Sequence, residues 1–225
     1  MRMPFELFVA LRYLFSRRKQ TFIYIISIMS ILGVALGVGA LVVVLGVYNG
    51  LTTDMRDKII GANAHGIVMS YVPAAFQQHP DLVRRVEAVE HVRGATPFIY
   101  TEVMLSAAGG VKGLVLRGID PESAPKVLSM LREIRRGSVA DLKREGTPGI
   151  VIGEELAKRL GIGLGSRVNL LSPSGEKGAT GYSPRIRPFE VVGIFKTGMF
   201  EYDATLAFVD LKAARDILGL PDGFL

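Results

Sequence analysis

The stretch that decides the fold is QTFIYIISIMSILGVALGVGALVVVLGVYNGLTT, from Gln20 to Thr53, which contains no Asp, Glu, Lys, Arg, His or Pro. As a helix, Phe22 to Tyr48 would extend about 40 Å, whereas the hydrocarbon core of a bilayer is about 30 Å thick. The sequence therefore predicts one transmembrane helix over residues 21–50 whose outer end continues into water. The run is longer than the apolar core of a signal peptide and lacks a small-residue cleavage site, so we expect it to remain as an anchor.

The composition fits a protein that lies partly in a membrane. Its 225 residues are 49% hydrophobic, and the mean hydropathy of +0.33 exceeds that of typical soluble domains. Much of the net charge of +6 precedes the apolar run, where several Arg and Lys residues accompany a single acid, Glu6. Such a patch suits anionic headgroups, so membrane lipid is an expected partner and nucleic acid is not. The chain has no Cys, which excludes disulfides and thiolate zinc sites.

The segment before the apolar run has the pattern of a short amphipathic helix. Its apolar side chains recur at helical spacing, at Phe5, Phe8, Leu11, Leu14 and Phe15. We expect residues 1–20 to form an elbow helix on the cytoplasmic leaflet, the alternative being an irregular hydrophobic lead-in.

The charges that flank the apolar run predict its orientation. Arg17, Arg18 and Lys19 precede it, whereas the basic residues that follow it are interleaved with Asp54 and Asp57. Because basic residues are retained in the cytoplasm, the N-terminus is expected there and residues 51–225 on the other side.

Two patterns inside the run concern contacts with other helices. Small residues spaced for close helix packing occur at Gly33, Gly37 and Ala40, although glycine is also common in membrane helices. An apolar stripe at i, i+3, i+4 and i+7, which can face lipid or a partner helix, consists of Val44, Val47, Tyr48 and Leu51.

The remainder alternates short strands with helices, which predicts an α+β domain with a mixed sheet. Strands are expected at 67–70, 98–106, 111–117, 149–152, 167–171, 189–195 and 205–209, with a hairpin turn at Gly109-Gly110. Helices are expected at 81–92, 125–136, 154–160 and 211–218. The last two end before Gly161 and Gly219, and Asp210 is expected to cap the last one.

The motifs that usually carry chemistry are missing. The chain has no P-loop motif, so we do not expect it to bind and hydrolyse ATP itself, and we expect no cofactor. The glycines of GIGLG, residues 161–165, follow a helix rather than a strand and fit a turn better than a dinucleotide site. The histidines, His65, His79 and His91, have no ligand spacing. Glu154 and Glu155 suit a helix N-terminus, so we assign no catalytic residue and no metal ligand.

One segment is unusually long for a connection in a compact domain. Residues 172–188 are rich in proline and glycine and contain little that could be buried, which is typical of functional or disordered loops. We expect it to protrude and to bind a partner, the alternative being an inert hairpin tip. Its candidate contact residues are Pro173, Tyr182, Pro184, Arg185, Ile186, Arg187 and Pro188.

The N-terminal third resembles the lipoprotein-releasing ABC transporter permeases of the Lol system. The similarity lies in ALRYL at residues 10–14, the following Arg17-Arg18, the apolar run and its exit IIGANAH at residues 59–65. Downstream, GIVIGEELAKRLGIGLGSRVNLLSP from Gly149 and FEVVGIFKTGMFEYDATLAFVDL from Phe189 are similar to the periplasmic domain of those permeases and of the wider MacB-like superfamily.

The resemblance implies a noncatalytic permease subunit in a bacterial inner membrane, with the N-terminus cytoplasmic and the main domain periplasmic. It implies a cytoplasmic ABC ATPase, a second permease subunit, lipoprotein clients and a periplasmic chaperone as partners. Acyl chains of the client would contact the stripe from Val44 to Leu51. The segment 172–188 falls where one branch of the family carries a chaperone-docking hairpin, the hook.

Two departures from the family pattern bear on this inference. Tyr48 and Leu51 stand where the common motif has Met and Phe, and relatives continue beyond the position of Leu225 with more domain and three further spans. The alternatives are a membrane-anchored periplasmic adaptor or signalling module, and an efflux or cell-division permease of the same superfamily.

Overall fold

The computed structural model describes residues 5–14, 21–69, 81–132, 134–178 and 181–220. The chain divides into two units, residues 1–55 and residues 56–225, and each is described by itself.

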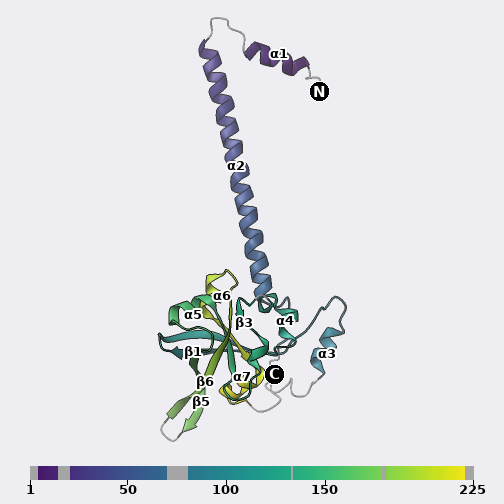
Figure 1. The fold of residues 1–225 in the computed structure, drawn as a ribbon. Helices are drawn as coiled ribbons and strands as arrows, with labels where there is room; N and C mark the ends of the chain where they lie inside the picture. The colour runs from purple at the N-terminus through teal and green to yellow at the C-terminus, as the bar shows by residue number, and fades with distance from the viewer. Residues whose placement is uncertain (1–4, 15–20, 70–80, 133, 179–180, 221–225) are drawn as a thin grey trace. The chain divides into compact units, whose positions relative to one another are not determined.

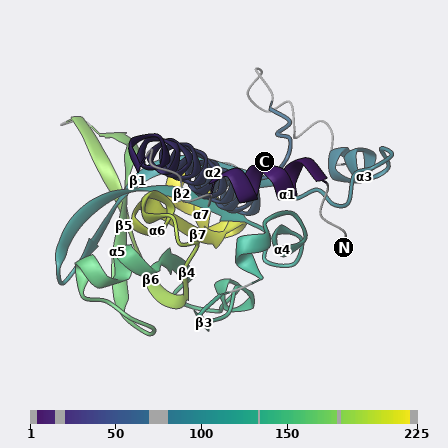
Figure 2. The same cartoon turned by 90° about the horizontal axis from the view of Figure 1, so that it is seen from above.

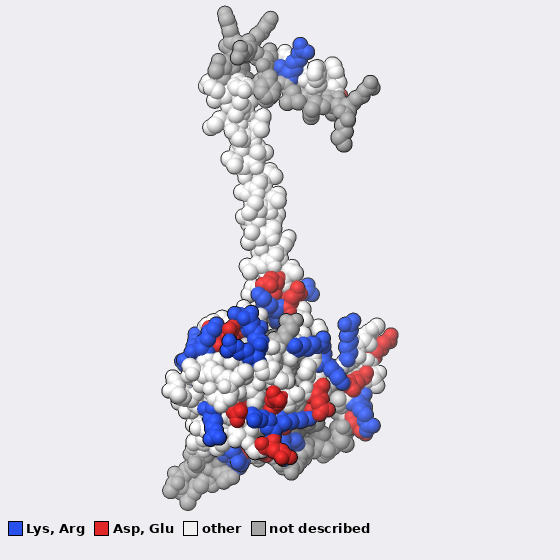
Figure 3. Space-filling model, in the orientation of Figure 1, with Lys and Arg blue, Asp and Glu red and all other residues white. Residues whose placement is uncertain are grey.

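The first unit is helical. Helix α1 covers Phe5–Leu14, and helix α2 covers Thr21–Ala62, the last seven residues of which belong to the second unit. Among the described residues, α2 is the one helix that is long and apolar enough to cross a membrane. Figure 3 shows most of its length without charged side chains. It continues past the predicted end at residue 50 because residues 51–62 contain no proline. Arg17, Arg18 and Lys19 lie outside the described residues.

The second unit is built on a mixed sheet (Figure 1). Within the described ranges its strands are β1 (Phe98–Ala107), β2 (Gly110–Ile119), β3 (Arg136–Gly137), β4 (Gly149–Gly153), β5 (Arg167–Gly178), β6 (Gly181–Phe195) and β7 (Leu206–Asp210). They lie in the order β3-β6-β4-β7-β2-β1-β5. The pairs β2–β7 and β4–β6 are parallel, and the other pairs are antiparallel. The expected α+β fold with a mixed sheet is confirmed.

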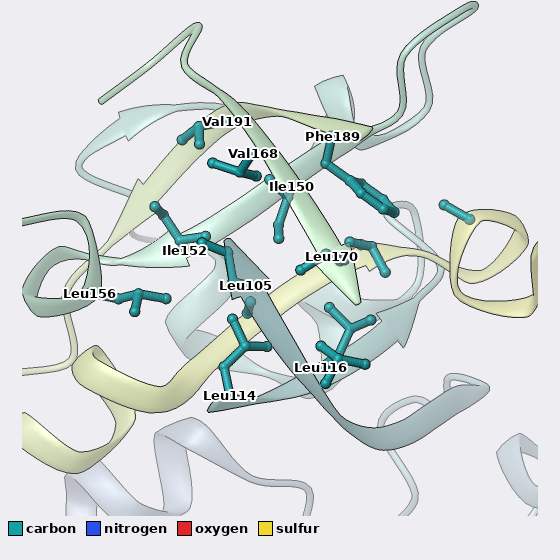
Figure 4. Packing of buried hydrophobic residues seen from close by; sticks show 14 of the residues in the cluster. Leu105, Leu114, Leu116, Ile150, Ile152, Leu156, Val168, Leu170, Phe189 and Val191 are labelled. Atoms are coloured by element: carbon teal, nitrogen blue, oxygen red, sulfur yellow. The ribbon is translucent and has the colours of Figure 1, made fainter. Parts of the chain in front are cut away.

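The sheet closes into a small barrel because β5 pairs with both of its neighbours. Residues 169–171 pair with β1, and the same strand pairs along its length with β6. The side chains inside form the larger hydrophobic cluster, drawn in Figure 4, with Leu105, Leu116, Ile150, Leu170 and Phe189 among its fully buried members. The cluster is completed by side chains from helices α5 (Glu154–Leu160) and α7 (Leu211–Leu218).

A second cluster covers the outer face of the sheet. Phe195 and Phe208 meet edge to face with ring centroids 5.6 Å apart. Their neighbours come from α4 (Ala124–Val127), the short 3-10 helices η2 (Ser129–Leu131) and η3 (Ala140–Leu142), and Ala62 at the end of α2. Figures 1 and 2 both place α4 on the side of the domain away from the β5–β6 hairpin.

Most of the predicted elements are confirmed. The strands at 98–106, 111–117, 149–152, 167–171, 189–195 and 205–209 are present, the last beginning at Leu206. Gly161 and Gly219 end α5 and α7 in the left-handed conformation, at φ of 62° and 67°. The Asp210 carboxylate accepts a hydrogen bond from the Lys212 amide at 3.0 Å, which caps α7 as expected.

Four predictions of secondary structure were wrong in whole or in part. Residues 67–69 form no strand, and the helix predicted at 81–92 is only α3, Leu82–Glu87. The helix predicted at 125–136 is divided into α4 and η2, because Arg136 and Gly137 are drawn into the sheet by pairing with β6. The segment 172–188 is not a loop: β5 and β6 continue through it to Gly178 and from Gly181, since pairing satisfies backbone groups that a loop would leave to water.

Candidate functional site: the end of α2 and the β5–β6 hairpin

The end of α2 is fixed to the domain through its backbone carbonyls. A helix leaves its last carbonyl groups without helical partners, and its C-terminus carries partial negative charge. The last turn of α2 contains no basic residue of its own. Arg117, on β2, supplies the cation: its guanidinium donates to the Ala62 carbonyl at 3.2 Å and to Asn63 Oδ1 at 2.9 Å.

Further contacts close the same junction. The Asn63 amide donates to the Tyr202 hydroxyl at 2.8 Å, and Tyr202 belongs to α6, Phe200–Thr205. On the other side the Ser129 hydroxyl donates to the Gly61 carbonyl at 3.2 Å. A Cβ added at Gly61 would lie 2.9 Å from Ser129 Oγ, closer than real Cβ contacts. Four segments distant in sequence thus meet at the end of α2, a group that we call the helix clamp: Gly61 to Asn63, Arg117, Ser129 and Tyr202.

Arg117 is mostly removed from solvent, and burial lowers its pKa from the ordinary value despite the opposing influence of Tyr202 and Tyr100. Its two Nη groups donate to the end of α2, whereas its buried Nε has no hydrogen-bond partner among the described residues. The sequence analysis missed the helix clamp. Its available signal was a single Arg in the otherwise apolar strand GLVLRGI, residues 113–119.

The β5–β6 hairpin is the second part of the site. The paired strands continue from Leu171 and Ile186 to the last pair, Gly178 and Gly181, with a register shift between Ser172 and Glu176. Figure 1 shows the hairpin protruding from the end of the domain that also carries α7. Of the predicted contact residues, Pro173, Pro184, Ile186, Arg187 and Pro188 are exposed, and the side chain of Tyr182 lies outside the described residues.

The two arginines of the hairpin differ in environment. Arg185 is half-buried: its guanidinium packs against Gly219, and its Nη1 donates to the Asp216 carbonyl at 3.5 Å, so it attaches the base of the hairpin to the end of α7. Arg187 is exposed and lines an open groove of about 800 Å³ at the hairpin base. Arg185 therefore has a structural role, and Arg187 is the arginine that is available to a partner.

The groove beside Arg187 has charged walls. The segment Leu142–Pro148 forms one wall, and Asp210 with two residues of α7, Lys212 and Asp216, forms another. Several of its cations are paired: Arg144 contacts Glu190 at 2.7 Å, and Lys143 contacts Asp120 and Glu122 at 3.1 Å each. Burial alone would raise the pKa of Asp120, but hydrogen bonds from Ser123 and Lys143 outweigh it and leave that pKa below its usual value.

The residues that the sequence analysis considered as metal ligands or as a nucleotide site do not form such a site. Among the described residues no group of three or more His, Asp or Glu side chains is placed to hold a metal ion. His65 and His91 are exposed, and His79 lies outside the described residues. The GIGLG segment forms the turn between α5 and β5, with Gly165 at φ of 78° and its amide bonded to the Val191 carbonyl.

The side chains on α2 that were predicted to contact acyl chains or other helices are exposed in the structure. The stripe of Val44, Val47, Tyr48 and Leu51 is exposed over 58–66% of its side-chain surface. A Cβ added at Gly33 or Gly37 would meet nothing within 4 Å, which leaves both positions open to a neighbouring helix. Helix packing at Gly33, Gly37 and Ala40 stays a prediction.

The fold and the sequence define the class of protein. The chain belongs to the family of MacB-like periplasmic core domains, whose model matches residues 27–223. It is 33% identical over 210 residues to the lipoprotein-releasing system transmembrane protein LolC of Neisseria meningitidis serogroup B, covering 93% of this chain and 50% of that protein. LolC of Xylella fastidiosa strain Temecula1 is 33% identical over 216 residues, covering 96% and 51%. The chain thus spans about half the length of these relatives.

Among solved structures, the periplasmic region of MacB from Actinobacillus actinomycetemcomitans is 14% identical, with a TM-score of 0.43 over 71% of this chain and 66% of that one.

Proposed function

We propose that the chain is the N-terminal part of a permease subunit that releases lipoproteins from a bacterial inner membrane. The similarity to LolC over nearly the whole chain is the observation that carries this proposal. The permease itself is noncatalytic, and a cytoplasmic ABC ATPase supplies the energy. Release requires a second permease subunit and ends with transfer of the lipoprotein to a periplasmic chaperone.

Three features of the structure support parts of this proposal. Helix α2 is long and apolar enough to cross the membrane, and its exposed stripe is available to acyl chains. The helix clamp connects the end of α2 to the sheet through Arg117. The hairpin offers exposed side chains to the chaperone. Movement of α2 would therefore reach the domain that presents the hairpin.

The orientation is part of the proposal and can be tested directly. With the N-terminus in the cytoplasm, protease should cut residues beyond 62 only after the outer membrane is opened. A protease-sensitive cytoplasmic protein, which must stay uncut, controls for lysis of the inner membrane. Cleavage that requires access from the cytoplasm would refute both the orientation and the proposed function in lipoprotein release.

The acyl-chain contact is tested by placing a charge in the stripe on α2. Val47→Asp should block ATP-dependent release of lipoproteins from proteoliposomes that contain the complete permease pair and its ATPase, because a carboxylate is costly beside an acyl chain. Val42→Asp, on the opposite face of the same helix and also exposed, is the control for insertion and abundance. If both variants lose release and abundance to the same degree, Val47 is a structural position only.

A membrane-anchored adaptor is the alternative from another class. It predicts that a longer form of the chain, isolated from membranes, carries no P-loop ATPase. Recovery of such an ATPase in a stoichiometric complex would exclude the adaptor.

A further inference from the structure

A basic surface with one exposed aromatic ring lies beside the point where α2 joins the domain. Lys58, in the next-to-last turn of α2, lies against the turn that precedes α6: a Cβ added at Gly198 would be 3.6 Å from Lys58 Cε and Nζ. Two residues later Phe200 opens α6. Helix α5 packs beside α6, and Figure 3 shows Lys and Arg gathered over this region.

Phe200 is exposed although the domain has two well-filled clusters. Its side chain is 56% exposed and belongs to neither cluster. The Arg159 guanidinium lies over its ring, 4.8 Å from the centroid. A phenylalanine held at the surface beneath a cation presents apolar area and positive charge together, which is the combination found at membrane interfaces.

Several cations surround Phe200, and acids pair with some of them. Glu154 contacts Lys196 at 2.8 Å and Lys158 at 3.7 Å, and Glu155 contacts Lys158 at 3.0 Å. The hydrogen bond from Lys196 is the main reason that the pKa of Glu154 lies below its usual value. Helix α6 adds Glu201 and the buried Asp203, and Asp54 and Asp57 precede Lys58 on α2. Arg135 adds a further positive charge near Glu154. We call the cations of this surface and its exposed ring the entry patch: Lys58, Arg135, Lys158, Arg159, Lys196 and Phe200.

We propose that the entry patch binds the anionic phospholipid headgroups of the bilayer that α2 crosses, with Phe200 inserted among them. Lys58 follows the last residue of the apolar stripe, Leu51, by seven positions, which is about 10 Å along a helix. The chain itself thus keeps the patch within reach of the headgroup layer. The inference rests on the membrane placement in the proposed function, and it adds a lipid contact that tethers this face of the domain to the bilayer.

The absence of tryptophan from the chain makes a direct test possible. Phe200→Trp places a single fluorophore in the patch of the full chain, reconstituted in vesicles of phosphatidylglycerol and phosphatidylcholine that contain lipid brominated near the headgroup. We expect bromine to quench this tryptophan. Ile186→Trp, at a hairpin position that is also 56% exposed, should stay unquenched and serves as the matched control.

The role of charge is tested in the same vesicles. Arg159→Gln in the Phe200→Trp background should lower the ratio of quenched to unquenched tryptophan about fivefold, the effect expected for one basic residue near an anionic surface. Lys112→Gln, an exposed residue of β2, should leave it unchanged. Hydrogen exchange of α6 in the unsubstituted chain should also be slower with phosphatidylglycerol than with phosphatidylcholine alone.

The outcomes separate this proposal from the proposed function. Equal quenching at positions 200 and 186 would overturn the headgroup contact, even if lipoprotein release is normal. So would quenching at position 200 that is the same with and without phosphatidylglycerol. Failure of the chain to float with the vesicles would instead overturn the membrane placement. Quenching at position 200 in a complex that releases no lipoprotein would support the patch and count against the proposed function.

Discussion

Replacing Pro173–Pro184 by an Asn-Gly turn is expected to lower capture of the periplasmic chaperone about 30-fold or more, the loss that corresponds to removing a binding hot spot of roughly 2 kcal/mol. The replacement joins Ser172 to Arg185, which already face each other across the hairpin, by a two-residue turn that suits antiparallel strands. The contacts of Arg185 with α7 are kept. Since neither hydrophobic cluster includes a residue of the removed segment whose side chain the structure describes, the melting temperature should change little.

The other hairpin of the domain supplies the control for this variant. Ala108→Asn creates the same Asn-Gly turn between β1 and β2, where Ala107 and Gly110 are the closing pair. Its chaperone capture, measured by co-purification, should equal that of the unsubstituted chain. Normal capture by the shortened hairpin would show that this segment is inert and that the chaperone docks elsewhere, if it docks at all.

Arg117→Met is expected to uncouple lipoprotein release from ATP hydrolysis in the complete complex. Methionine retains much of the apolar stem but removes the donors to Ala62 and Asn63, so the end of α2 loses its attachment to β2. Hydrogen bonds to a charged group contribute about 1.5–3 kcal/mol each, so the domain should also be less stable. The number of lipoproteins released per ATP hydrolysed, measured in proteoliposomes, should fall while hydrolysis continues.

Two further variants show whether this loss comes from the helix clamp or from general destabilisation. Lys112→Met changes an exposed cation of the same strand and should leave release and stability unchanged. Arg117→Lys keeps the charge but cannot hold two acceptors with a planar fork, so it should recover only part of the coupling. Unchanged release per ATP in Arg117→Met would mean that α2 acts on the domain by another route.

The parts of the fold that follow from local signals could be predicted from the sequence. The β1–β2 hairpin was visible from its apolar strands, although its turn is Ala108-Gly109, one position before the predicted Gly109-Gly110. The ends of α5 and α7 were visible from Gly161 and Gly219. These features depend on residues a few positions apart, so their physical causes are contained in short windows.

Features that depend on distant pairing could not be predicted in this way. The barrel closes through three pairs between residues 104–106 and 169–171, which no local pattern indicates. The helix predicted over 125–136 had a suitable apolar spacing, but pairing of Arg136 with Ile194 prevailed over it. For the site, the sequence indicated which segment protrudes, but not that Arg185 contacts α7 while Arg187 faces a groove. The helix clamp was missed for the same reason, because its members come from four separate segments.

The closure of the barrel also has a consequence for evolution. Because β5 is held on both edges before the hairpin begins, the strands beyond Ser172 are not needed to complete the sheet. Changes in their length and composition therefore need not disturb the barrel. A hairpin taken from another member of the family, joined at Ser172 and Arg185, would be an exchangeable part that carries its own partner preference onto this barrel.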